Sequence, residues 1–237
     1  MILEIKNLKF KYPSSLRLVL DIPQFSLAKG EKVFLYGPSG CGKTTFLETL
    51  AGVIVPDEGE IEVAGTQMNR LSVTERDTFR ANHVGYIFQS FNLIPYLSVL
   101  ENITLPLYLS SQKRKQVSQA EELEETKKLC SKLGLTYLLE KKVTELSVGQ
   151  QQRVAAARAV IGRPELIFAD EPTSSLDYDH REKFINLLFD VCKQYQISVL
   201  FVSHDKTLQK LFDRAVSLPE INKASMMFQE LDEASTT

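Results

Sequence analysis

The sequence predicts an α/β fold built on a parallel sheet, with an antiparallel β subdomain and an inserted helical subdomain. Short, continuously apolar runs at residues 33–36, 166–169 and 199–202 are separated by helical stretches, which is typical of parallel strands buried on both faces. Residues 1–27 instead alternate apolar and polar side chains, as antiparallel strands do. Residues 110–142 are charged, helix-favouring and nearly free of glycine.

The N-terminal region is expected to form two antiparallel strands joined by a turn. Apolar side chains recur within residues 3–10 and again within 18–25, and Pro13 and two serines lie between the two runs. The next apolar run, at 33–36, ends at Gly37. Ligands of a parallel sheet bind at the carboxyl ends of its strands, so we expect functional residues directly after such runs.

The composition is that of an ordinary globular protein. The chain has 237 residues, of which 43% are hydrophobic and 24% charged, and this argues against disorder. A net charge of −2 gives no basic field over the whole chain, so no nucleic-acid partner is expected. No apolar run approaches the roughly 18 residues that span a bilayer, and the first residues resemble a strand more than a secretory signal. The cysteines Cys41, Cys130 and Cys192 are scattered, which predicts a reducing compartment and no disulfide framework.

A phosphate-binding loop is predicted between Gly37 and Thr44. This segment matches the pattern G-x-x-x-x-G-K-[ST], follows a strand and precedes a helix expected at 44–50, so it predicts a P-loop NTPase core. Glycines let consecutive backbone N–H groups converge on phosphate oxygens, and the helix dipole favours the negative charge. Lys43 is expected to reach the β- and γ-phosphates of a nucleotide and Thr44 to bind Mg²⁺. The alternative, a glycine-rich turn without a ligand, does not explain this context.

An acidic pair follows a second apolar run. Asp170 and Glu171 come after residues 166–169 and precede Pro172, which cannot continue a strand ladder. Asp170 is expected to hold Mg²⁺, directly or through a water molecule. Glu171 is expected to orient or deprotonate the attacking water. An Asp-Glu-Pro turn without function is the alternative, and the phosphate loop in the same chain favours the catalytic interpretation.

A third motif precedes the helix expected at 151–161. In the sequence Leu-Ser-Val-Gly-Gln at 146–150, Ser147 and Gln150 have the spacing of a capping box. The same residues can form an anion site, because Ser147 and the backbone of Gly149 lie at a helix N-terminus. The two interpretations are compatible.

Together, these motifs resemble the nucleotide-binding domain of ATP-binding cassette (ABC) transporters over roughly residues 1–220. Residues 146–150 resemble the signature motif of that family, although Val148 stands where glycine is usual. The resemblance implies roles for four further residues: the Q-loop glutamine Gln89, the D-loop aspartate Asp177, the switch histidine His204 and the adenine-stacking aromatic Tyr12. Without the family context, Tyr12 and His204 are more simply interpreted as structural residues, and a glutamine after a strand indicates almost nothing.

The resemblance implies an ATPase that converts ATP and water to ADP and phosphate, with Mg²⁺ as cofactor. It implies a head-to-tail dimer, in which ATP on one subunit meets the signature motif of the other. The implied catalytic residues are Glu171, His204 and Gln89, and the implied Mg²⁺ ligands are Thr44, Gln89 and Asp170. The residues implied to bind the nucleotide are Tyr12, Gly37, Pro38, Ser39, Gly40, Cys41, Gly42, Lys43, Thr44, Thr45, Ser147, Gly149, Gln150 and Asp177.

Residues 88–103 resemble the Q-loop segment of the lipoprotein-releasing and macrolide-exporting branch of the family, and that of cell-division and some amino-acid-uptake ATPases. The resemblance implies a separate membrane permease as partner, a second ABC ATPase subunit in a homodimer, and a cytoplasmic location on the inner face of the cell membrane. The alternative is a cell-division-type ATPase that regulates a membrane partner without transport. The apolar residues at 91–97 either pack into the helical subdomain or are exposed for a partner.

The expected domain organisation follows from these assignments. One ABC ATPase domain is predicted at 1–220, with the α/β core and β subdomain at about 1–89 and 161–220 and the helical subdomain at about 90–160. The remaining residues, 221–237, are predicted to be a frayed or loosely docked tail, because the hydrophobic periodicity is lost after Pro219. The Asp-Gly turn common near the last core strand of the family is also missing, so residues 220–237 lie outside the resemblance.

Overall fold

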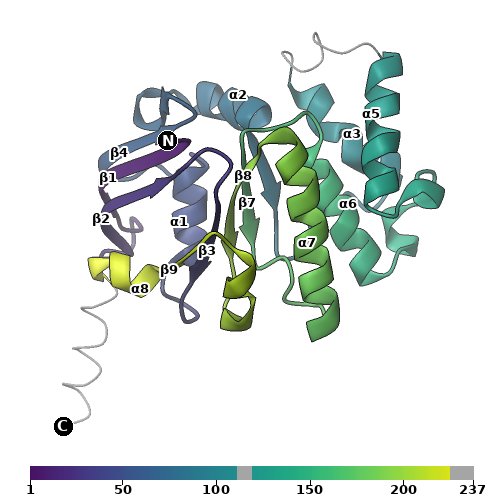
Figure 1. Cartoon of the computed structure of the whole chain (residues 1–237). Coiled ribbons are helices and arrows are strands. Elements are labelled where there is room, and N and C mark those ends of the chain that lie inside the picture. Colours follow the sequence, from purple (N-terminus) through teal and green to yellow (C-terminus); the bar gives the residue numbers. More distant parts are fainter. Residues whose placement is uncertain (111–118, 225–237) are drawn as a thin grey trace.

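A five-stranded parallel sheet forms the centre of the computed structural model, which describes residues 1–110 and 119–224 (Figure 1). The strand order is β6-β7-β8-β3-β9, and every neighbouring pair is parallel, as predicted. β7 and β8 are buried along their whole length, which explains their continuously apolar sequences. The strands are β3 (Lys32–Tyr36), β6 (Val84–Ile87), β7 (Leu166–Asp170), β8 (Ser198–Val202) and β9 (Arg214–Ser217).

A four-stranded antiparallel sheet packs beside it, in the order β2-β1-β4-β5. β1 and β2 pair from Leu3 opposite Leu27 to Phe10 opposite Leu20, so the predicted antiparallel pair is confirmed. Helix α1 (Lys43–Leu50) shares one hydrophobic core with both sheets. The strands are β1 (Leu3–Phe10), β2 (Leu20–Leu27), β4 (Glu58–Val63) and β5 (Thr66–Gln67).

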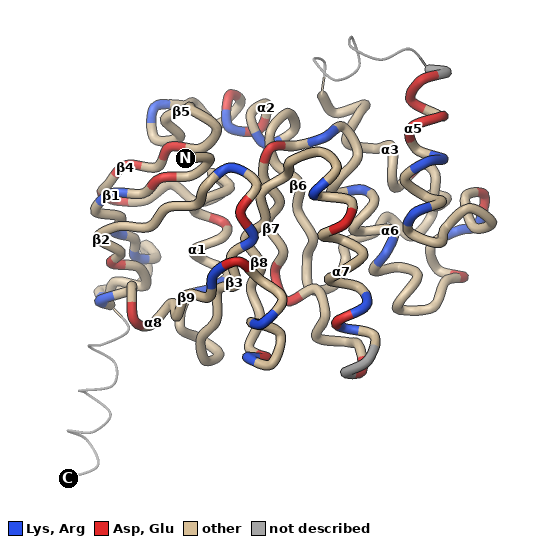
Figure 2. The backbone as a smooth tube through the Cα atoms, in the orientation of Figure 1, with Lys and Arg blue, Asp and Glu red and all other residues tan. Residues whose placement is uncertain are grey.

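The helices α3, α5 and α6 lie beyond β6 and β7 and pack around a second core (Figure 1). The predicted helical character between 110 and 142 is confirmed by α5, while residues 111–118 lie outside the described part of the chain. Figure 2 shows acidic residues toward the start of α5 and basic residues toward its end, the order that the helix dipole favours. The remaining elements are α2 (Val73–His83), α3 (Val99–Leu109), α5 (Gln119–Lys132), α6 (Val148–Val160), α7 (Tyr178–Tyr195), α8 (Leu218–Ile221) and 3₁₀ turns at Met68–Arg70, Thr136–Leu138, Val143–Glu145 and Lys206–Leu211.

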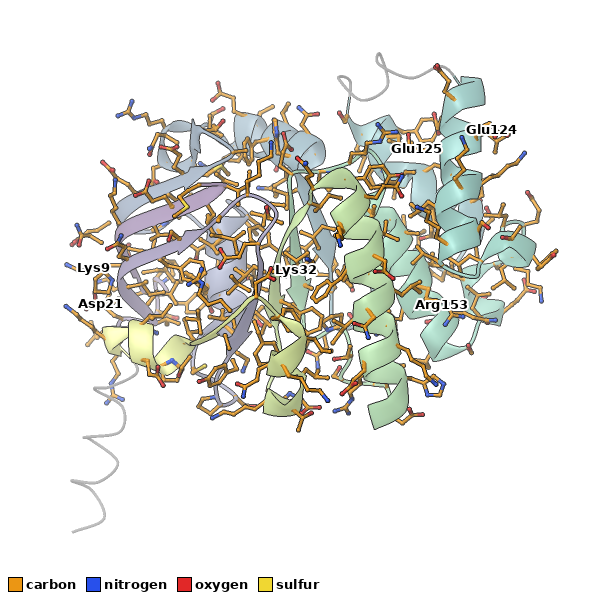
Figure 3. The ribbon with its side chains drawn as sticks, in the orientation of Figure 1. Lys9, Asp21, Lys32, Glu124, Glu125 and Arg153 are labelled. Atoms are coloured by element: carbon orange, nitrogen blue, oxygen red, sulfur yellow. The ribbon has the colours of Figure 1, made fainter. Side chains whose placement is uncertain are left out.

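The segment after β9 is more tightly bound than the expected loose tail. Asn222 is fully buried. Its side chain donates a hydrogen bond to the carbonyl of Val19 at 2.9 Å and accepts one from the backbone N–H of Asp21 at 2.7 Å. Asp21 lies beside α8 in Figure 3. The chain is therefore held to β2 as far as Ala224, and residues 225–237 of the expected tail lie outside the described residues.

Among the described residues, no helix combines the length and the apolar character that crossing a membrane requires.

Candidate active site

The predicted motifs meet at the carboxyl edge of the parallel sheet. Gly37 follows β3, Gln89 lies two residues after the end of β6, Asp170 ends β7 and His204 lies two residues after the end of β8. Register places these ends side by side, because Val202 pairs with Leu35 on one side and with Asp170 on the other. The topology therefore gathers residues that are far apart in the sequence at one edge, as expected for an α/β ligand site.

The phosphate loop has the backbone conformation that its glycines permit. Gly40 and Gly42 have φ values of +79° and +97°, in the left-handed region where residues with a Cβ are strained. Gly42 also caps α1, which begins at Lys43, close to the predicted start. The first turn of α1 contains no acidic side chain, so its N–H groups remain favourable for an anion.

The ammonium group of Lys43 is buried inside this loop, with 7% of the residue exposed. Its Nζ donates hydrogen bonds to the carbonyls of Gly37 at 3.0 Å and Pro38 at 2.9 Å. It also lies 3.7 Å from Oε1 of Glu171. Because a buried charge is costly unless it is paired, these contacts keep the lysine at the centre of the loop and link it to the acidic pair.

Thr44 and Asp170 form a pair of oxygen donors. The Thr44 hydroxyl donates a hydrogen bond of 3.0 Å to Oδ2 of Asp170. Burial raises the pKa of the Asp170 carboxyl, and Glu171 raises it further, while the Thr44 hydroxyl and the Lys43 ammonium oppose the rise. A hydroxyl and a carboxylate fit Mg²⁺, which favours oxygen ligands and would stabilise the ionised carboxylate. The described residues contain no cluster of three or more His, Cys, Asp or Glu side chains able to hold a metal.

Glu171 occupies a strained corner between β7 and Pro172. Its φ of +45° is unusual for a residue with a Cβ, and its backbone N–H is held by the carbonyl of Val202 at 3.0 Å. Its Oε2 lies 2.9 Å from Nδ1 of His204, whose side chain is 57% exposed. Such strain is found preferentially at functional sites, and here it turns a half-buried carboxylate toward Lys43 and His204.

Tyr12 contacts helix α1 from the β subdomain. Its hydroxyl lies 3.1 Å from the hydroxyl of Thr45, and its ring meets Phe10 edge-on at a centroid distance of 5.0 Å. Tyr12 is 41% exposed, so part of the ring surface remains accessible beside the phosphate loop.

The signature segment lies on the other side of the parallel sheet from α1. The residues of α1 pack in one core and those of α6 in the other, and Figure 1 places the sheet between them. The predicted capping box is confirmed: Gln150 N–H donates to the Ser147 hydroxyl at 3.3 Å, and Ser147 N–H donates to Gln150 Oε1 at 2.9 Å. Ser147 is exposed, so its hydroxyl is accessible from outside the chain.

Gln89 and Asp177 are both exposed. Asp177 caps α7 by accepting a hydrogen bond from the backbone N–H of His180 at 3.1 Å. Hydrogen bonds from the side chain and the backbone of His180 lower the pKa of the Asp177 carboxyl.

The apolar segment after Gln89 divides into buried and exposed residues. Phe91 is 6% exposed and belongs to the second core, whereas Tyr96 is 74% exposed. Of the two alternatives, packing into the helical subdomain therefore holds for Phe91, whereas Tyr96 is exposed. Asn102 fixes this segment and had not been predicted: its amide accepts from Ile94 N–H at 2.8 Å and is fully buried. The available signal was an asparagine among the apolar residues of this helix.

Comparisons with known proteins agree with this geometry. The family model described as "ABC transporter" matches residues 20–174. The uncharacterized ABC transporter ATP-binding protein YbbA of Escherichia coli (strain K12) is 41% identical over 200 residues, which cover 84% of this chain and 86% of the relative. The lipoprotein-releasing system ATP-binding protein LolD of Psychrobacter arcticus is 38% identical over 189 residues, which cover 80% of this chain and 82% of the relative.

A solved structure resembles the whole fold. It is the dimeric, post-hydrolysis state of the ATP-binding cassette MJ0796 bound to ADP and Pi, with a TM-score of 0.81 and 32% sequence identity. The likeness covers 94% of this chain and 95% of that chain. With the family match over more than half of the sequence, and with the phosphate loop and acidic pair at one sheet edge, the chain belongs to the ABC transporter family, as one of its ATP-binding subunits with ATPase activity.

Proposed function

We propose that this ATPase drives a separate membrane permease of the lipoprotein-releasing or a related export type. The observation that supports the catalytic part is the contact of Glu171 with both Lys43 and His204, next to the Thr44–Asp170 pair. The identity of 38% to a lipoprotein-releasing ATP-binding protein supports the choice of branch.

The proposed reaction assigns each group a task. The loop N–H groups and the Lys43 ammonium bind the phosphates of ATP, and Thr44 and Asp170 hold Mg²⁺ with Gln89 as a further ligand. Bound Mg²⁺ supplies positive charge against the β- and γ-phosphates. Glu171 orients the attacking water and accepts its proton. His204, held by Glu171 through Nδ1, contacts the γ-phosphate.

The dimer is proposed to be a head-to-tail homodimer. Ser147 and Gly149 of one copy face the γ-phosphate of the ATP bound to the other copy, and Tyr12 stacks on the adenine. Two observations support this arrangement: Ser147 is exposed on the opposite side of the sheet from α1, and the cassette MJ0796 is dimeric.

The permease is proposed to bind beside the segment that follows Gln89, which would hold this chain on the inner face of the cell membrane. A cavity of about 230 Å³ lies there, and Phe88, Pro106 and Leu109 are among its lining residues. Leu109 is 68% exposed and Phe88 37% exposed. Exposed apolar side chains around a concave surface favour a protein partner.

The test is Glu171→Gln in the full chain, with Glu58→Gln as the matched control, because Glu58 is exposed on the β subdomain. Glu171→Gln is expected to bind ATP, to hydrolyse it at least ~10²-fold more slowly, and to accumulate a dimer during gel filtration with Mg²⁺ and ATP. The control should keep the parental rate. A near-parental rate for Glu171→Gln would exclude the catalytic assignment.

A second measurement addresses the permease. Affinity-tagged chain, extracted from membranes in mild detergent, should retain a membrane-spanning protein, identified by mass spectrometry. If the chain is recovered from membranes without one, the transport assignment fails while the ATPase assignment stands.

A further inference from the structure

Helix α6 makes hydrogen bonds to two segments of the active site. Near its start, Gln152 Nε2 donates to the carbonyl of Pro172 at 2.7 Å, and Pro172 directly follows Glu171. Near its end, Arg158 donates to the carbonyl of Phe91 at 2.6 Å and to that of Asn92 at 2.7 Å. The helix that begins with the signature motif therefore holds both the acidic corner and the segment that carries Gln89.

Gln89 lies within a turn that its own sequence does not favour. Phe91 and Asn92 have φ values of +60° and +47°, and two consecutive left-handed residues with a Cβ are unfavourable without support. Phe91 N–H donates to the carbonyl of Phe88 at 3.0 Å, and the Ser90 hydroxyl donates to Asn92 Oδ1 at 2.8 Å. These bonds close the turn. The side chain of Phe91 packs into the second core, and the hydrogen bonds from Arg158 join the carbonyls of the two left-handed residues to α6.

The guanidinium of Arg158 is suited to this task. It is planar, so two of its N–H groups can serve the carbonyls of neighbouring residues at the same time, which a lysine ammonium cannot do in one fixed geometry. It is half-buried, and burial lowers its pKa, so its hydrogen bonds are less weakened by water than those of an exposed arginine.

Helix α6 can fix the turn because the helix itself is rigidly packed. Residues 154–157 are fully buried in the second core. Arg158 lies ten residues after Val148, roughly 15 Å along a straight helix at its usual rise. A displacement of the first turn of α6 would therefore reach the turn around Gln89 through the helix and Arg158.

We propose that Arg158 is a positioning residue for ATP hydrolysis: it anchors the turn 88–92 to α6 and thereby sets where Gln89 lies at the active site. The inference rests on the proposed role of Gln89 in hydrolysis. It adds that the orientation of Gln89 is governed by the helix that carries the signature serine of the same chain.

The kinetic test compares Arg158→Ala, Arg158→Lys and the matched control Arg163→Ala in the full chain. Arg163 follows the end of α6 and pairs with Glu125 and the Tyr195 ring instead of the turn. Arg158→Ala is expected to lower kcat about 10- to 100-fold, as a misplaced catalytic group does, with the dissociation constant of ATP within about threefold of the parent. The kcat of Arg158→Lys should lie between those of the parent and Arg158→Ala, and the kcat of the control should match that of the parent.

A double-mutant cycle with Gln89→Ala separates positioning from general structural damage. If Arg158 acts through Gln89, its substitution costs nothing further once Gln89 is gone, so the double variant hydrolyses ATP as fast as Gln89→Ala alone. Multiplied losses would overturn the proposal, and so would a parental kcat for Arg158→Ala. If Arg158→Ala does not fold, the same cycle with Arg158→Lys decides. A parental rate for Gln89→Ala would instead refute the proposed role of Gln89, and this inference with it.

Discussion

Substitution by serine should destabilise the fold at Phe91 but hardly at Tyr96, an aromatic residue five positions later. Phe91 is 6% exposed in the second core, and Tyr96 is 74% exposed. Burial of a phenylalanine side chain contributes about 2–3 kcal/mol, and the cavity left by truncation raises the cost to about 3–5 kcal/mol. Phe91→Ser is therefore expected to lower the free energy of unfolding by about 3–5 kcal/mol. Tyr96→Ser should change it by less than about 0.5 kcal/mol.

Urea unfolding of the two variants and the parent measures both changes, with linear extrapolation at a common slope. Co-purification with the proposed permease supplies the second readout, because an exposed aromatic side chain on a partner surface affects binding more than stability. Tyr96→Ser should then reduce recovery of the permease while its melting temperature stays parental. The reasoning is refuted if Phe91→Ser is as stable as the parent, or if Tyr96→Ser loses more than about 1 kcal/mol.

Three further predictions concern other parts of the chain. Asn102→Ala should cost about 1–3 kcal/mol in urea unfolding, because the part-buried N–H of Ile94 loses its acceptor, and an effect below about 0.5 kcal/mol would contradict this. Burial raises the pKa of the Cys41 thiol, so its reaction with a maleimide, followed by mass spectrometry, should be slow. Mg²⁺ with ATP should slow the labelling further. Labelled chain that binds ATP with parental affinity would disprove a place for Cys41 in the nucleotide site. Burial alone would raise the pKa of Glu31, but hydrogen bonds from Arg214 and a backbone N–H outweigh it and lower the pKa of the folded state. The ionised carboxylate therefore stabilises the fold above its ordinary pKa of 4.5, and this stabilisation is lost as the pH falls through the lower folded pKa. The difference in urea midpoint between the parent and Glu31→Gln should therefore be smaller at about pH 4 than at about pH 6.

The sheet and the phosphate loop were predictable because their signals are local. A strand buried on both faces must be continuously apolar, and this is visible at 33–36, 166–169 and 199–202 without knowledge of the partner strands. The loop pattern is equally local, since its glycines, lysine and threonine lie within eight consecutive residues. Both predictions use only neighbouring residues.

The contacts that position the site were not predictable in the same way. Arg158 bonds to residues 66 and 67 positions earlier in the chain, and Asn222 bonds to residues 201 and 203 positions earlier. An arginine on a helix and an asparagine near the C-terminus carry no local sign of such partners. The burial of Phe91 had the same difficulty, because an apolar segment indicates contact with something but does not distinguish the core from another protein.

The charges of the site determine which substitution probes it cleanly. Lys43 lies 3.7 Å from Glu171 and lowers the pKa of Asp170, so the lysine acts on the carboxylate proposed to hold Mg²⁺ as well as on the proposed phosphate site. Removing the lysine would leave two adjacent carboxylates without their buried countercharge, and at least one pKa would rise. A loss of activity in that variant would then combine weaker phosphate binding with weaker Mg²⁺ binding. Glu171→Gln keeps the side-chain shape, removes a charge that raises the pKa of Asp170, and leaves Lys43 paired with its two loop carbonyls. It therefore removes the proposed proton acceptor and leaves the lysine of the phosphate loop in place, and this is why the proposed mechanism is tested at the glutamate and not at the lysine.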